Sequence, residues 1–327
     1  MFYTVLRSFV RFGMHWYVPD LRLSSMDLAR FQGPALVVSN HPNSLFDALV
    51  LAVYAPVEIR YLARGDMFKN PIANVVLRNL FMLPIYKKSD DPEFLVKNDF
   101  TYDECIRNLQ AGKHILIFPE GRSHNLWQLQ HFMNGGISTL LERAIKADIP
   151  LQVQPYVLHY SSFKVAPKAL SIQALPSIDA TDYLVDNAVQ SSDLIKTLRA
   201  SLAQHMDPLP LQPRLLAPRK AQLLRIPAQI GYYSQYWFYK LWRDYVAKKT
   251  KGTIFFDSML FVGLLFSYPL LVLLFSVLVA QFAGFWIGLL LFIALPATAY
   301  CMAVHHKIKP QADTKTWQVN YFPKEEE

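Results

Sequence analysis

The chain has 327 residues, of which 52% are hydrophobic and 14% aromatic, and its formal net charge is +8 at neutral pH. A mean hydropathy of +0.15 is high for a soluble protein and indicates a membrane component. The basic residues do not form runs interleaved with turns, so the charge argues against a nucleic-acid-binding protein and favours an anionic lipid surface. Cys105 and Cys301 lie in very different sequence surroundings. They predict neither a disulfide framework nor a metal site, and they fit a reducing, cytosol-facing protein.

The first 18 residues mix aromatic and aliphatic side chains with Arg7, Arg11 and His15, which are spaced four apart. This spacing places the three basic groups on one face of a helix. The apolar run is interrupted and no small-residue cleavage site follows, so a cleavable signal peptide is not indicated. We expect residues 1–30 to contain a helix that lies in the membrane interface. The alternative is an amphipathic helix packed on the domain.

Strand and helix patterns alternate between residues 31 and 206. The alternation predicts an α/β domain with a mixed sheet flanked by helices. The expected strands cover residues 35–39, 58–63, 82–86, 114–118, 152–158 and 170–175, and the expected helices cover 43–54, 71–81, 92–111, 136–147 and 191–205.

The first polar turn of this domain follows the apolar run that ends at Val38, and it contains His41 with Asp47 six positions later. Six residues of α-helix rotate a side chain by about 240°, so the two groups do not face each other along one helix. They meet if His41 lies on the turn and Asp47 on the following helix, where Pro42 suits a first helical position. In such a pair the carboxylate accepts a hydrogen bond from the N–H of one ring nitrogen and leaves the other nitrogen free as a base.

A second polar turn, Phe118-Pro-Glu-Gly121, follows another apolar run. Together the two turns resemble the glycerolipid acyltransferase family, the enzymes that acylate glycerol 3-phosphate and lysophospholipids. That family has a histidine-to-aspartate motif, a basic block, a Phe-Pro-Glu-Gly motif and an apolar block with proline. All four occur here in this order across residues 35–160. The resemblance implies that His41 is the general base of an acyl transfer and that Asp47 holds its imidazole.

The resemblance also implies that the second turn binds the acceptor. Gly121 permits a tight backbone where a side chain would block a ligand. Glu120 would accept hydrogen bonds from the hydroxyls of the acceptor or orient a neighbouring cation, and Arg122 would bind phosphate. Many members of the family have a threonine between this glycine and the arginine, whereas here Arg122 follows directly. We expect Ser123 and His124 to have structural roles.

Two further cations come from the basic block. Lys87 matches the family position that helps to hold the phosphate of the acceptor, although arginine is usual there, and lysine does not form the bidentate fork of arginine. Arg64 is the second candidate. We expect Lys88 to be a surface residue.

The C-terminal third is expected to lie at and in a membrane. Residues 207–251 combine a proline-rich, basic part over 207–227, expected not to be helical, with an aromatic and basic part suited to lipid headgroups. Residues 252–309 contain two apolar segments, 258–280 and 283–304, each long enough to span a bilayer. Lysines precede the first segment and basic residues follow the second, so both ends are predicted on the cytoplasmic side, before a tail over 310–327.

These features predict a phospholipid-biosynthesis O-acyltransferase in a bacterial inner membrane or an ER-type membrane. The donor would be acyl-CoA or acyl carrier protein, with no cofactor and no metal. Glycerol 3-phosphate and lysophosphatidate both offer the required hydroxyl and phosphate, and the sequence does not choose between them. The alternatives are a membrane-anchored lipid-binding scaffold and an acyltransferase for another lyso-lipid or a non-glycerol acceptor. A serine hydrolase is disfavoured because no Gly-x-Ser-x-Gly elbow is present.

Overall fold

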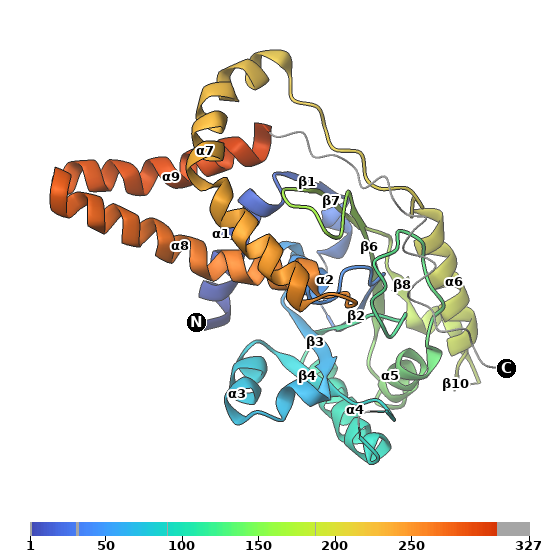
Figure 1. Cartoon of the computed structure of the whole chain (residues 1–327). Helices are drawn as coiled ribbons and strands as arrows, with labels where there is room; N and C mark the ends of the chain where they lie inside the picture. Colours follow the sequence, from blue (N-terminus) through green and yellow to red (C-terminus); the bar gives the residue numbers. More distant parts are fainter. Residues whose placement is uncertain (1, 31–32, 90, 187, 306–327) are drawn as a thin grey trace. The chain divides into compact units, whose positions relative to one another are not determined.

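The computed structural model describes residues 2–30, 33–89, 91–186 and 188–305 (Figure 1). The chain divides into two compact units, which are described separately. The first comprises Met1–Phe12, Leu23–Leu158 and Ser171–Pro208, and the second comprises Gly13–Arg22, His159–Leu170 and Leu209–Glu327. The predicted tail over 310–327 and the basic residues predicted to follow the hairpin at 306, 307 and 309 lie outside the described residues.

One mixed sheet organises the first unit. Its strand order is β1-β7-β6-β2-β5-β3-β4, and β8 pairs with β6. The pairs β2–β5, β2–β6, β3–β5 and β3–β4 are parallel, whereas β8 is antiparallel to β6, which confirms the expected α/β class. The strands are β1 (Asp20–Ser24), β2 (Ala35–Ser39), β3 (Ile59–Arg64), β4 (Met82–Ile85), β5 (His114–Ile117), β6 (Gln152–Tyr160), β7 (Ala169–Ala174) and β8 (Ile178–Asp179). A separate antiparallel pair joins β9 (Leu184–Val185) and β10 (Ala188–Val189).

Helices connect these strands close to where they were predicted. Short 3-10 turns lie at η1 (Met26–Ala29), η2 (Gly65–Phe68) and η3 (Ala180–Tyr183). The α-helices are α1 (Phe2–Tyr17), α2 (Leu45–Tyr54), α3 (Pro71–Asn79), α4 (Phe94–Gln110), α5 (Asn134–Lys146) and α6 (Ser191–Gln204).

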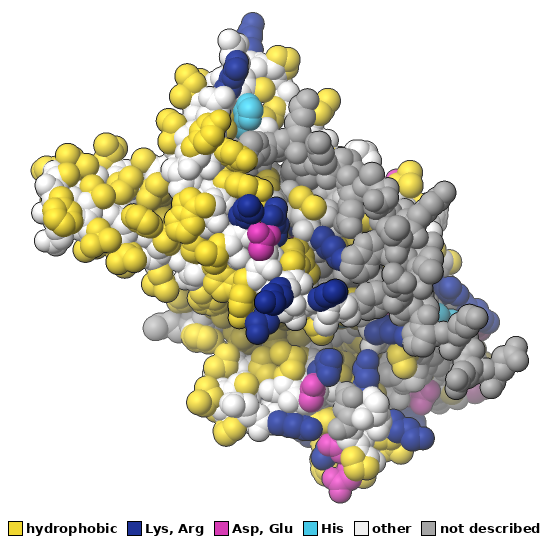
Figure 2. Space-filling model, in the orientation of Figure 1, with side chains coloured by type: hydrophobic (Ala, Val, Ile, Leu, Met, Phe, Trp, Pro, Cys, Tyr) yellow, Lys and Arg dark blue, Asp and Glu magenta, His cyan; other side chains and the backbone are white. Residues whose placement is uncertain are grey.

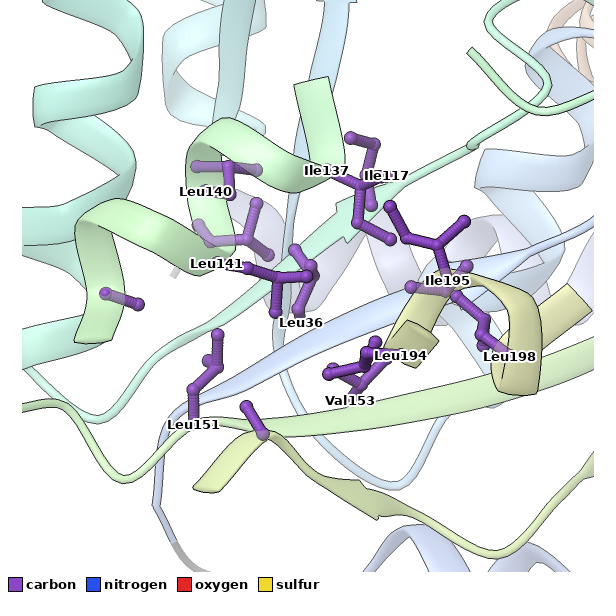
Figure 3. Packing of buried hydrophobic residues seen from close by; sticks show 14 of the residues in the cluster. Leu36, Ile117, Ile137, Leu140, Leu141, Leu151, Val153, Leu194, Ile195 and Leu198 are labelled. Atoms are coloured by element: carbon purple, nitrogen blue, oxygen red, sulfur yellow. The ribbon is translucent and has the colours of Figure 1, made fainter. Parts of the chain in front are cut away.

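The hydrophobic core of the first unit lies between the sheet and the helices α4, α5 and α6 (Figure 3). Leu36 of β2, Ile117 of β5 and Val153 of β6 point into it and meet Leu140 of α5 and Leu198 of α6. Every residue of β2 is buried, including those that point to the opposite face of the sheet. A strand buried on both faces needs a continuous apolar run, and this explains why residues 35–38 were recognisable in the sequence.

The basic face of α1 packs on the end of α2. Arg7 donates hydrogen bonds to the carbonyl oxygens of Val53 (3.2 Å) and Ala55 (2.7 Å). Arg11 lies over the ring of Tyr54, 5.7 Å from its centroid. Cations are favourable at a helix C-terminus because they satisfy its last carbonyls and complement the helix dipole. These two arginines therefore fix this face of α1 to the end of α2.

In the second unit, α8 (Phe256–Ala283) and α9 (Phe285–His305) form an apolar hairpin (Figure 1). Both helices are long and apolar enough to cross a membrane, and only 17% of the most apolar stretch of each is buried. Hydrophobic side chains cover the surface of the hairpin (Figure 2). This exposure distinguishes the pair from the buried core helices of a soluble protein.

A long helix, α7 (Pro218–Lys249), packs against the hairpin. Gln235 of α7 donates to the carbonyl oxygen of Leu295 and to the hydroxyl of Thr298, both at 3.0 Å, and accepts from the hydroxyl of Tyr268. Gly231 lies so close to Thr298 that a Cβ there would be 2.3 Å from its carbonyl oxygen. Small residues and buried amides are the usual means by which apolar helices associate.

The prediction that residues 207–227 are not helical was wrong from Pro218 onward. Pro218 occupies the first turn of α7, where the missing N–H has no intrahelical partner to lose. Pro227 lies inside the helix. It removes one hydrogen bond of the helix. The nearby Ala228 and Gly231 are buried.

A buried polar cluster joins the start of α8 to the rest of the second unit. The ammonium of Lys168 pairs with Asp257 and donates to the carbonyl oxygen of Ser162 at 3.0 Å. The hydroxyl of Tyr17 donates to the same carboxylate. Lys168 and Asp257 are both excluded from solvent. Because a buried charge is costly unless paired, this cluster fixes the first turn of α8 to the loop between β6 and β7.

Candidate active site

Two adjacent parallel strands bring the polar turns together. β2 and β5 pair in parallel, with Val38 opposite Ile117. Parallel neighbours end at the same edge of a sheet, so the turns that follow residues 39 and 117 lie side by side. The backbone N–H of Asn125 donates to the carbonyl oxygen of Pro42 at 2.8 Å, which ties the second turn to the first.

His41 and Asp47 form the predicted pair. The Nδ1 atom of His41 lies 2.9 Å from Oδ2 of Asp47, and the same carboxylate oxygen accepts the backbone N–H of Asn43 at 2.7 Å. The Asp47 side chain is fully buried, whereas 18% of the His41 side chain is exposed. A carboxylate accepts hydrogen bonds, so Nδ1 carries the proton and Nε2 presents its lone pair.

The local chain geometry explains how the pair meets. His41 lies on the turn and Asp47 in the first turn of α2, which begins at Leu45 rather than at residue 43. Ser44 precedes the helix with a φ of +55°, an uncommon backbone conformation for a residue with a side chain. This bend reverses the chain so that the first turn of the helix faces back to His41.

Phe118 stacks on one face of the His41 imidazole, a contact that the sequence analysis missed. The two rings are stacked, with centroids 3.8 Å apart and planes inclined by 9°. The imidazole of His41 is therefore fixed by Asp47 at one edge and by Phe118 over one face. An aromatic residue directly before the Pro-Glu-Gly sequence was the available signal, but nothing in the sequence shows which ring it covers.

Glu120 is buried rather than open to a ligand. Its Oε1 accepts the backbone N–H of His41 at 3.2 Å, and its Oε2 is paired with Nε2 of His124. Its side chain has no exposed surface. The carboxylate thus connects the two turns.

Gly121 and the two nearest cations form the exposed part of the second turn. Gly121 has a φ of +66°, and a Cβ there would lie 2.3 Å from Sδ of Met133, so both conformation and space favour glycine. The ammonium of Lys87 donates to the carbonyl oxygen of Gly121 at 3.1 Å. Arg122 is exposed, and no ion pair joins it to another described side chain.

Arg64 is held differently from Lys87. Its guanidinium makes two hydrogen bonds to the carboxylate of Asp66, at 3.0 and 2.8 Å, and both side chains are exposed. It is engaged by its own neighbour rather than by either polar turn. As for metals, the described parts of the chain contain no group of three or more His, Cys, Asp or Glu residues arranged to hold an ion.

Comparisons with known proteins agree with the motif assignment. A family model described as Acyltransferase matches residues 20–158. A crystal structure of the 1-acyl-sn-glycerophosphate acyltransferase PlsC from Thermotoga maritima is similar, with 15% sequence identity and a TM-score of 0.46, over 62% of this chain and 77% of that one. No curated protein sequence matches the chain. The resemblance inferred from the motifs is thus confirmed by the family model, which matches the segment that contains both polar turns.

Proposed function

We propose that this protein is a glycerolipid O-acyltransferase that moves a fatty acyl group from a thioester to a hydroxyl of lysophosphatidate or glycerol 3-phosphate. The observation that carries the proposal is the fixed imidazole of His41. Asp47 accepts a hydrogen bond from Nδ1–H and Phe118 stacks on the face of the ring. In the neutral imidazole this leaves the lone pair on Nε2. A positioned neutral imidazole at the end of a strand is suited to act as a general base.

The reaction needs no covalent acyl-enzyme. Nε2 of His41 takes the proton of the acceptor hydroxyl while the hydroxyl oxygen attacks the thioester carbonyl. The resulting tetrahedral intermediate collapses, breaks the carbon–sulfur bond and expels a thiolate, which takes the proton back from the imidazolium. Asp47 stabilises the imidazolium during the interval in which it is charged.

The charge beside the turn supports a phosphorylated acceptor. Lys87 reaches the carbonyl of Gly121, and Arg122 lies exposed next to it. An ammonium and a guanidinium are the two side chains most used for phosphate recognition in proteins. We assign the acceptor phosphate to these two cations, and Glu120 and Gly121 shape the turn on which it rests. Arg64, paired with Asp66, is a third candidate that becomes available if a phosphate displaces this carboxylate.

Two further features support a lipid substrate. A small pocket lies between α1 and α2, and most of its lining is aliphatic, including Leu6, Leu45 and Leu49. On α1, Phe2, Val5 and Phe12 are exposed along one side. A stripe of this kind is typical of a helix that rests in the membrane interface, which fits the location predicted for α1.

We further propose that α8 and α9 anchor the protein in the membrane. Lys248, Lys249 and Lys251 precede the hairpin, and its tip between the two helices carries no charge. Following the positive-inside rule, we propose that both ends, and the catalytic domain, lie on the cytosolic face. An anchored enzyme remains at the surface into which the acylated product partitions.

The experiment is an acceptor and donor panel on the protein purified in detergent. Radiolabelled acyl-CoA and acyl-loaded carrier protein are each combined with glycerol 3-phosphate, micellar lysophosphatidate or a lyso-lipid without a phosphomonoester. Released thiol and labelled lipid are measured together. His41→Ala is the control, and we expect its rate to fall by about 10²- to 10⁴-fold.

Transfer to one phosphorylated acceptor, lost in His41→Ala, supports the proposal and identifies the substrate. If thiol release is the same with and without every acceptor, or the same in the variant, the proposed function is wrong. Preference for the lyso-lipid without a phosphomonoester would contradict the assignment of Lys87 and Arg122 while keeping the acyl transfer.

A further inference from the structure

The carboxylate of Glu120 is fully engaged by the protein. One oxygen accepts the backbone N–H of His41 at 3.2 Å, and the other is paired with Nε2 of His124. The side chain has no solvent-exposed surface. A substrate hydroxyl would have to displace one of these donors, and a buried N–H left without a partner is costly.

The hydrogen bonds of His124 define its tautomer. The backbone N–H of Leu126 donates to Nδ1 of His124 at 3.1 Å. An amide nitrogen only donates, so Nδ1 holds a lone pair, and the proton of the neutral ring is on Nε2, where it faces Glu120. Only 6% of the His124 side chain is exposed. His124 is thus a directed donor to Glu120, and the loop backbone fixes its orientation.

These contacts hold the backbone that carries the catalytic imidazole. Glu120 accepts the N–H of His41, and the N–H of Asn125 donates to the carbonyl of Pro42 at 2.8 Å. One hydrogen bond therefore lies on each side of the His41 α-carbon, and both come from the second turn. Asp47 and Phe118 fix the direction of the ring, but they do not fix the place from which the ring projects.

We propose that Glu120 and His124 are positioning residues for His41 and not ligands of the acceptor. The inference rests on the proposed function of His41 as the base. His124 donates to Glu120, and Glu120 holds the His41 amide, so the turn keeps Nε2 of His41 aimed at the acceptor hydroxyl. A displacement of about 1 Å at a reacting group lowers a rate by about 10²-fold, so loss of either residue lowers kcat while acceptor binding is retained.

The test compares His124→Gln with His124→Asn. The amide nitrogen of glutamine lies near the position of Nε2 and can donate to Glu120. The shorter asparagine can accept from Leu126 near the position of Nδ1, but it does not reach Glu120. His131→Gln is the matched control, because His131 is exposed in the same loop.

We expect kcat to fall about 10- to 100-fold in His124→Asn and distinctly less in His124→Gln, with the KM for the acceptor within about twofold of wild type. Glu120→Gln should behave like His124→Asn, because its amide group faces one of two N–H donors. His131→Gln should match wild type. If these substitutions raise the KM for the acceptor and leave kcat unchanged, Glu120 binds substrate and the proposal is wrong. A purely structural role predicts equal losses in the Gln and Asn variants, in proportion to their loss of thermal stability.

A measurement on the wild-type protein tests the geometry without relying on activity. In a long-range ¹H–¹⁵N spectrum of histidine-labelled protein, His124 should appear as the Nε2–H tautomer and His41 as the Nδ1–H tautomer. The signal that disappears in His124→Gln assigns His124. An Nδ1–H tautomer or an imidazolium at His124 overturns the proposal even if no acceptor is found. A correct tautomer in a protein without transferase activity would leave the geometry standing and refute the proposed function alone.

Discussion

Replacing Asp47 by asparagine separates the charge of the catalytic pair from its geometry. Oδ2 of Asp47 accepts two N–H groups, from the ring of His41 at 2.9 Å and from the backbone of Asn43 at 2.7 Å. In Asp47→Asn the side chain keeps one carbonyl oxygen. We expect this oxygen to take the position of Oδ2, because the backbone N–H of Asn43 makes no hydrogen bond to an NH₂ group. The imidazole then keeps its tautomer and its direction but loses the negative charge beside it.

The expected fall in kcat follows from the distance between the imidazole of His41 and the carboxylate of Asp47. Two unit charges 2.9 Å apart attract by about 6 kcal/mol at an effective dielectric constant of about 20. Desolvation offsets part of this attraction, and removal of a comparable preorganised electrostatic partner costs about 2.7–4 kcal/mol. The imidazole is charged only after it takes the proton, so this cost is felt in the transition state. We expect kcat to fall by about 10²- to 10³-fold, with each 1.36 kcal/mol giving a factor of about ten.

The assay is the initial rate of thiol release for wild type, Asp47→Asn, His41→Ala and the double variant. Residues that act as a unit are strongly non-additive, so the double variant should be as slow as His41→Ala alone. Thermal unfolding of Asp47→Asn is measured beside the rates, so that a loss of stability is told apart from the loss of charge. A single variant within threefold of wild type, or a double variant slower by the product of the two single effects, would refute the reasoning.

Three further substitutions or reagents test other parts of the first unit. Lys87→Ala should raise the KM for the phosphorylated acceptor about tenfold or more, because a hydrogen bond to a charged group contributes about 1.5–3 kcal/mol. Lys88 is its exposed neighbour, and Lys88→Ala should leave this KM unchanged in the same titration. Gly121→Ala should destabilise the protein by about 1–2 kcal/mol in chemical unfolding, since φ is +66°, and adding Met133→Ala should recover only the part that comes from the clash. Burial raises the pKa of the Cys105 thiol to about 12. In Cys301→Ser, a maleimide at pH 8 should therefore label Cys105 only after unfolding. Rapid labelling of the folded protein would contradict the burial of this thiol.

The sequence was most informative where one physical constraint dominates. The strand over residues 35–39 was predicted with its exact bounds because burial on both faces requires an unbroken apolar run. The helix after His41 begins two residues later than predicted, because Ser44 adopts a positive φ that no pattern of polar and apolar residues reveals. In α7, a rule about proline was applied too broadly, since Pro218 lies at the helix start, where proline is favourable.

Contacts between distant segments were beyond the sequence. Arg7 was predicted only to lie on the basic face of a helix, and the fold shows that it donates to carbonyls of Val53 and Ala55, more than 40 residues away along the chain. Glu120 was identified by its motif, but its burial and its bond to the His41 amide depend on the pairing of two strands. The motif identified these side chains, and only the fold shows that Glu120 faces the His41 amide and the ring of His124 rather than solvent.

The order of the strands separates the two polar turns from Arg64 and from the strand that precedes Lys87. The two polar turns follow β2 and β5, which are neighbours within the sheet. Arg64 ends β3, the next strand beyond β5, and Lys87 follows β4, the edge strand on that side. All of the chain between Asp47 and β5 is an excursion that leaves the central strands and returns to them. A change in the length or in the cations of this excursion would leave the pairing of β2 with β5 in place, and with it the meeting of the two polar turns.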